Sequence, residues 1–119
     1  MADHNELGKK GEEFAIDFLI EAGYKILEKN YRFQKAEVDI IALKGLVLAI
    51  VEVKTRSTDY FGNPQDFVNP KKIKLLLSAI DHYVVEKDLD VEVRFDIIAV
   101  ILQKKEKKLV HLKDAYLYF

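Results

Sequence analysis

Residues 46–56, LVLAIVEVKTR, decide the fold and the candidate site of this chain. The first six are all apolar, which is typical of a strand buried on both faces of a sheet. Glu52 and Lys54 follow with one residue between them, so the alternation of a strand points both side chains to one face. The segment therefore predicts a buried strand that ends in an acid and a base.

Length, net charge and composition limit the functions in which such a strand can take part. The chain has 119 residues and a formal net charge of -1, which predicts one domain over residues 1–119. Proteins that bind nucleic acid strongly are commonly basic overall, so a polyanion site here has to be local. The absence of cysteine excludes disulfide frameworks, thiolate zinc sites and thiol nucleophiles. Without a signal core or an apolar run near 18 residues, we expect a soluble, cytoplasmic protein with no membrane partner.

Apolar periodicity predicts the elements around this strand. Helices are expected over 5–23 and 71–87, strands over 24–33, 37–43, 46–54 and 91–102, and a short fifth strand over 109–112. Pro70 is well placed to begin the second helix, with Asn69 as its cap. Gly8 and Gly11 lie in the apolar stripe of the first helix, where a neighbour could approach its backbone closely. Glu12 lies at the edge of that stripe. The order αβββαβ predicts an α/β fold in which helices flank a mixed central sheet.

A tight hairpin is predicted between the second and third strands, with Lys44 and Gly45 as a two-residue turn. The expected pairs are Leu43 with Leu46, Asp39 with Ile50, and Glu37 with Glu52. In this register Asp39 and Glu52 share a face as diagonal neighbours, with Cβ atoms about 7–8 Å apart. A three-residue loop would instead send Asp39 to the opposite face.

Two carboxylates and a lysine on one face suggest a cation site. Mg²⁺ prefers oxygen ligands, and the carbonyl of Val53 could join Asp39 and Glu52 as a third. Such an ion neutralises charge on a phosphate, and Lys54 could position the attacking water. Taken alone, Glu52 and Lys54 are more simply an ion pair at a strand end, with Glu37 and Asp39 solvated. The cation site is favoured because charges beside buried surface are disfavoured unless they are paired or coordinating.

The ordered motifs resemble a known family. The sequence EVD at 37–39, followed after a hairpin by EVK at 52–54, is similar to the PD-(D/E)XK nuclease superfamily. Together with GKKGEEFAIDF upstream and RFDIIAV downstream, it resembles the small uncharacterised YraN family, which is related to archaeal Holliday-junction resolvases. The resemblance implies a restriction-endonuclease-like core, with Asp39 and Glu52 as metal-binding acids, Lys54 as the lysine and Glu12 as the helix acid. Ala36 departs from the family pattern, which usually has glycine there.

Several other residues are candidates for contacts with nucleic acid. Arg32, Arg56, Lys71 and Lys72 could contact phosphates, although the lysines also suit a solvated helix start. Tyr60 and Phe61 could stack on bases, but capping the core is the favoured interpretation. KKEKK at 104–108 is predicted to be a solvated turn, and Asp96 is predicted to pair structurally.

The first hypothesis is a DNA endonuclease dependent on Mg²⁺ or Mn²⁺, with branched or junction DNA as the substrate that the resemblance implies. A homodimer is a candidate assembly, since junction resolvases work as dimers. The alternative is a nucleic-acid-binding module without turnover, and a third is a purely structural or oligomerisation domain. The sequence leaves open whether Glu37 rather than Glu12 is the accessory acid.

Overall fold

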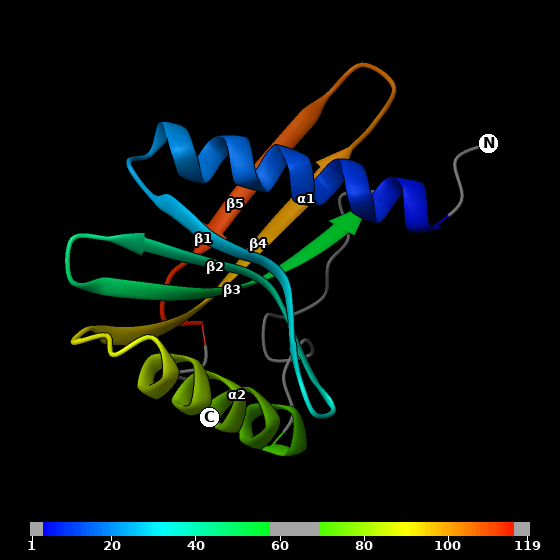
Figure 1. Ribbon diagram of the computed structural model, residues 1–119. Helices are drawn as coiled ribbons and strands as arrows, with labels where there is room; N and C mark the ends of the chain where they lie inside the picture. Colours follow the sequence, from blue (N-terminus) through cyan, green and yellow to red (C-terminus); the bar gives the residue numbers. More distant parts are fainter. Residues whose placement is uncertain (1–3, 58–69, 116–119) are drawn as a thin grey trace.

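A mixed five-stranded sheet carries one helix on each face in the computed structural model, which describes residues 4–57 and 70–115 (Figure 1). The elements are α1 (His4–Glu21), β1 (Lys25–Phe33), β2 (Ala36–Lys44), β3 (Val47–Arg56), α2 (Pro70–Glu86), β4 (Glu92–Leu102) and β5 (Lys107–Leu112). The predicted α/β class and the αβββαβ order are confirmed, and the fifth strand is longer than expected. This architecture is compatible with a restriction-endonuclease-like core.

β3 lies at the centre of the sheet, whose order is β1-β2-β3-β4-β5. It pairs antiparallel with β2 and parallel with β4, so the sheet is mixed as predicted. Its apolar run is buried on both faces. Ala49 and Val51 pack in the cluster with Ala15 and Leu19 of α1, whereas Leu48 and Ile50 pack with α2.

The β2–β3 hairpin forms in a different register from the one predicted. Lys44 pairs with Val47, and Ile41 pairs with Ile50. The turn is therefore Gly45 and Leu46 rather than Lys44 and Gly45, which shifts every predicted pair by two residues. Gly45 has a φ of 61°, a left-handed conformation that suits glycine best, and this explains why the turn begins there. A shift of two preserves the alternation, so Ile41 still shares a face with Ile50.

Beyond Ile40 the alternation in β2 breaks, which the sequence did not predict. Val38 and Ile40 are two apart and should share a face, but Val38 packs in the α2 cluster and Ile40 in the α1 cluster. The regular β2–β3 pairing also ends at Ile40 with Val51. Across the β1–β2 ladder, Asn30 has a φ of 53° between the pairs of Lys29 and Tyr31. The β1–β2 hairpin bends toward α2 (Figure 1). Asp39 lies between Val38 and Ile40, where the regular β2–β3 pairing has ended.

Asp96 lies at the centre of a buried polar network away from this bend. The prediction that Asp96 pairs structurally is confirmed. Its side chain is fully buried on β4. Arg94 donates two hydrogen bonds to its carboxylate, from Nε at 2.9 Å and from Nη2 at 2.8 Å, and His111 Nε2 lies 2.7 Å from Oδ2. Arg94 also donates to the Tyr24 hydroxyl at 2.6 Å. The network joins β4, β5 and the end of α1.

Two further predictions concern the helices and the loop between β3 and α2. α2 begins at Pro70 as predicted, while Asn69, Tyr60 and Phe61 lie outside the described residues.

Within 4–57 and 70–115, no helix is long and apolar enough to cross a membrane.

Candidate active site

Asp39 lies where β2 separates from β3, and a backbone group of β3 holds it there. The N–H of Val53 donates to Asp39 Oδ2 at 2.8 Å. The side chain thus takes the place of the β2 backbone that would pair with Val53 in a continuing ladder. Because the N–H and C=O of one strand residue face the same neighbouring strand, the Val53 carbonyl also faces the side where Asp39 lies.

Three acids from two elements line one depression beside this contact. Glu12 comes from α1, and Glu37 and Asp39 come from β2; Lys54 and Arg56 of β3 line the same depression. Burial raises the pKa of Glu12, and the charges of Asp39 and Glu37 raise it further. Glu12 and Glu37 were alternatives for the accessory acid, and the fold brings both of them to Asp39.

The pKa of Asp39 reports the same crowding of negative charge. Burial raises it most, and the charges of Glu52 and Glu37 add to the increase. The Val53 N–H and the ammonium of Lys72 act in the opposite direction, but the pKa remains above its ordinary value. Carboxylates that raise one another's pKa create a negative potential that a cation would relieve.

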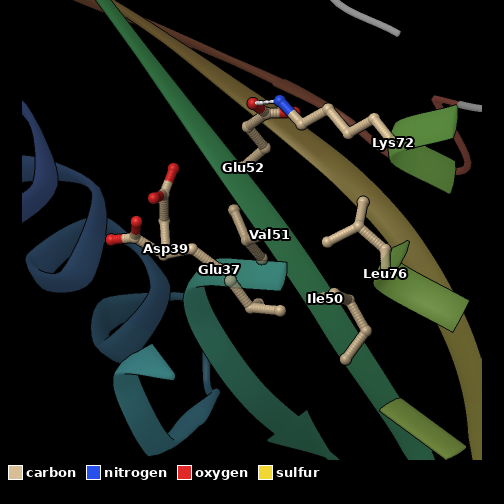
Figure 2. Close-up of a pocket in the computed structure, with 8 residues that line it drawn as sticks. Glu37, Asp39, Ile50, Val51, Glu52, Lys72 and Leu76 are labelled. Carbon is tan, nitrogen blue, oxygen red and sulfur yellow. Dashed lines mark hydrogen bonds and ion pairs between the residues drawn. The ribbon is translucent and has the colours of Figure 1, made fainter. Parts of the chain in front are cut away.

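Glu52 is the second predicted metal-binding acid, and two lysines hold it. Its Oε1 lies 3.2 Å from Lys54 Nζ and also contacts Lys72 Nζ, which reaches across from α2. Figure 2 shows the Glu52 carboxylate turned toward Lys72, with Asp39 on the other side of the β3 ribbon. Both acids line a small pocket between β2, β3 and α2. The charge of Glu52 acts on Asp39, so the two acids remain neighbours in a register two residues from the predicted one.

α1 approaches β3 closely beside this site. A Cβ on Gly11 would lie only 2.8 Å from Cβ and Cγ2 of Thr55, so no side chain fits there. Gly11 precedes Glu12 and Thr55 follows Lys54, so this contact fixes α1 against β3 next to two residues that line the depression. The close approach predicted from the apolar stripe is confirmed at Gly11, whereas Gly8 has no neighbour within 4 Å of an added Cβ.

The four residues predicted to contact phosphate lie in different surroundings in the structure. Arg56 lies in the depression with Glu12 and Lys54, but it is exposed and donates to the Thr55 carbonyl. Lys72 is bound to Glu52 rather than pointing to solvent. Lys71 is exposed on the first turn of α2 and lines neither the depression nor the small pocket. Arg32 is exposed on β1, and its Nη2 lies 3.7 Å from Glu37 Oε2. Sequence reasoning missed Asn30. Its left-handed backbone lies opposite Asp39 in the β1–β2 ladder, and no sequence motif marks it.

The donor set fits a hard divalent cation by its chemistry. Carboxylate and carbonyl oxygens are the ligands that Mg²⁺ and Mn²⁺ prefer, and Asp39, Glu52 and the Val53 carbonyl supply them. As placed, no three acidic or histidine side chains among the described residues converge closely enough to hold a metal ion. Lys72 occupies the Glu52 oxygen that a cation shared with Asp39 would use.

Comparison with known proteins identifies the family. Residues 11–100 match the family described as "Uncharacterised protein family UPF0102". The chain is 63% identical to a UPF0102 protein of Christiangramia forsetii over 119 residues, covering all of both chains. It is 42% identical to a UPF0102 protein of Phocaeicola vulgatus over 116 residues, which is 98% of this chain and 96% of the relative. The chain belongs to the UPF0102 family, which confirms the predicted membership of a small uncharacterised family.

Proposed function

We propose that this UPF0102 protein is a metal-dependent DNA endonuclease of the PD-(D/E)XK type. The observation that carries the proposal is the site at the end of β3. There, acids with raised pKa values lie beside an acid–lysine pair and a strand carbonyl, mounted on a strand that is buried on both faces. A purely structural protein has no need of mutually repelling carboxylates, because they lower its stability.

Asp39 and Glu52 would hold Mg²⁺ or Mn²⁺, with the Val53 carbonyl as a third oxygen donor. When bound, the cation supplies Lewis-acid stabilisation of the charge that develops on the phosphate. Lys54 orients the nucleophilic water and adds positive charge beside the phosphate. Glu12 and Glu37 assist through water, since both line the depression that contains Asp39 and Lys54. Arg56 contacts the phosphate backbone from the rim of that depression.

The resemblance to junction resolvases makes branched DNA the first substrate to try. The full chain is incubated with labelled linear duplex, flapped duplex and four-way junction, with Mg²⁺ or Mn²⁺ and with EDTA as the blank. Lys54→Ala and Asp39→Asn are the site variants, and Lys25→Ala is the matched control, because Lys25 is exposed at the opposite end of the sheet. Loss of a preorganised electrostatic group typically lowers turnover about 10²–10³-fold.

We expect wild type and Lys25→Ala to cleave at least one substrate, and both site variants to be defective. Absence of cleavage by the wild type, or equal cleavage by the site variants, would refute the proposed function. Metal-dependent DNA binding without cleavage would favour the alternative, a binding module on the same fold. Gel filtration of the protein with and without junction DNA tests the homodimer.

A further inference from the structure

The β4–β5 turn lies at the same end of the sheet as the candidate site. β4 runs parallel to β3, and Arg56 pairs with Ile101. Lys104 is three residues beyond Ile101, about 10 Å along the chain at roughly 3.3 Å per residue. The turn and the start of β5 contain four lysines and one glutamate within residues 104–108, a local charge of +3 in a chain of net charge -1. The pattern KKEKK therefore stands beside the site, not at a remote edge.

A groove beside the turn neighbours the acidic depression of the site. Leu7 lines both the acidic depression and a second groove between α1 and the β4–β5 hairpin. Lys10, Lys104 and Lys107 line that second groove. Lys107 Nζ lies 5.8 Å from the centre of the Phe14 ring. This cation–π contact holds the β4–β5 hairpin against α1. The two acids of the groove, Glu13 and Asp17, both belong to α1.

We propose that the β4–β5 hairpin and Lys10 form an accessory surface for the backbone of duplex DNA. The inference rests on the proposed function for its ligand, and it assigns the hairpin lysines a role that their sequence pattern alone does not. In a duplex, successive nucleotides of one strand are about 3.4 Å apart along the axis. Lys54 pairs with Ala99, so Lys104 lies five residues beyond it, about 16 Å at roughly 3.3 Å per residue. Lys104 and Lys105 would therefore meet phosphates roughly five nucleotides from the bond that lies over Lys54.

This surface explains how a chain of net charge -1 could hold a polyanion. Salt-dependent affinity follows the number of phosphates that cations neutralise locally, not the total charge of the protein. The acids of the site repel phosphate until a cation binds, so affinity in the absence of metal has to come from elsewhere. The hairpin places its lysines outside the acidic depression but within reach of the same duplex.

The test is DNA binding without cleavage. A fluorescein-labelled 20-base-pair duplex is titrated with the full chain in EDTA, with anisotropy measured over a series of salt concentrations. The variant is Lys104→Gln with Lys105→Gln. The matched control is Lys25→Gln with Lys87→Gln, which changes the net charge equally. Both control lysines are exposed at the opposite end of the sheet: Lys25 pairs with Leu43 beside the β2–β3 turn, and Lys87 directly follows α2.

We expect the hairpin variant to bind more weakly, with the slope of log affinity against log salt smaller by about 2 in magnitude. The control should keep the wild-type slope. Equal slopes for both variants, or no binding by the wild type, would overturn the accessory surface. Cleavage of the linear, flapped and four-way-junction DNA with Mn²⁺ separates the two proposals. Intact cleavage with equal slopes refutes only this surface, whereas a slope difference without cleavage refutes only the nuclease.

Discussion

Thr55 of β3 occupies the space that a side chain on Gly11 of α1 would need. Both Cβ and Cγ2 of Thr55 would lie 2.8 Å from an added Cβ, closer than carbon atoms can approach without displacement. Because Glu12 and Lys54 are the chain neighbours of these two residues, a small displacement of α1 is transmitted directly to the candidate site. Packing and chemistry are thus coupled at one contact.

Gly11→Ala should destabilise the protein by about 1–3 kcal/mol through overpacking, and it should lower cleavage by moving Glu12 away from Lys54. Gly8→Ala is the matched control, because it lies on the same helix with open space around it. There the better helix propensity of alanine should raise the free energy of unfolding by about 0.5–1 kcal/mol. Urea denaturation gives both values. Equal effects of the two substitutions would contradict the close packing at Thr55.

Asp39→Asn should abolish cleavage, by more than about 100-fold, and yet stabilise the fold at neutral pH. The pKa of Asp39 is raised in the folded state, so the native protein binds this proton more tightly than the unfolded chain does. Its contribution to stability is therefore present below the ordinary value of 3.8 and is lost as pH rises through the folded-state pKa. Asparagine cannot ionise, but its side-chain oxygen can still accept the Val53 N–H.

Thermal unfolding of wild type and Asp39→Asn at pH 7 and at pH 3 checks this sign. The variant should have the higher midpoint at pH 7, and the advantage should vanish at pH 3. A lower midpoint at pH 7 would mean that the ionised carboxylate stabilises the fold, contrary to the repulsion inferred from Glu52 and Glu37.

Lys72→Ala should strengthen cation binding. Lys72 contacts the Glu52 oxygen that a shared cation would use, so ammonium and metal compete for it. Removing one like charge at this partly exposed position is worth roughly 1 kcal/mol, about a fivefold lower dissociation constant for Mn²⁺. Calorimetric titration of Mn²⁺ measures it. Lys71→Ala is the control, and weaker binding by the Lys72 variant would show that this lysine supports the cation instead.

Asp96→Asn should cost about 3 kcal/mol of unfolding free energy, because it leaves the half-buried Arg94 without its charged partner. Burial acts to raise the pKa of Asp96, but hydrogen bonds from His111 and Arg94 outweigh it and hold the pKa below its ordinary value. The stabilisation is therefore full above pH 3.8 and is lost as pH falls through the folded-state pKa.

Chemical denaturation between pH 2 and pH 7 tests this network. The wild type should lose stability at the acid end of the range, and Asp96→Asn should lose less because it has no proton to gain there. Asp90→Asn, at an exposed position, should follow the wild type within about 0.5 kcal/mol. An Asp96 variant as stable as wild type at pH 7 would contradict the network.

Much of the fold follows from apolar pattern alone. The unbroken apolar run of β3 predicts a central strand, because only a strand covered on both faces of the sheet buries every side chain in such a run. The stripe with Gly11 predicts a helix that packs closely, and Pro70 predicts where α2 begins. The motif residues Glu12, Asp39, Glu52 and Lys54 could likewise be selected from spacing and resemblance, and the fold brings all four to one end of β3.

Register and direction could not be predicted in the same way. Lys44–Gly45 and Gly45–Leu46 both contain a glycine that can take a left-handed conformation, so the sequence does not choose between these two turns; in the structure the turn is Gly45 and Leu46. The break in the alternation of β2 lies opposite the left-handed backbone of Asn30 across the ladder, which no pattern in β2 reveals. Lys72 is 20 residues from Glu52 along the chain, so their contact exists only because α2 packs on that face.

The sequence by itself determined the elements, their order and the residue types of the candidate site, because periodicity and spacing are local properties of the chain. Only the tertiary structure decided that Val53 holds Asp39, that Lys72 engages Glu52, and that the β4–β5 lysines stand beside the site. These relationships join segments distant in the chain. They are set by core packing and by the parallel pairing of β3 with β4, which brings the carboxyl ends of both strands to one edge of the molecule.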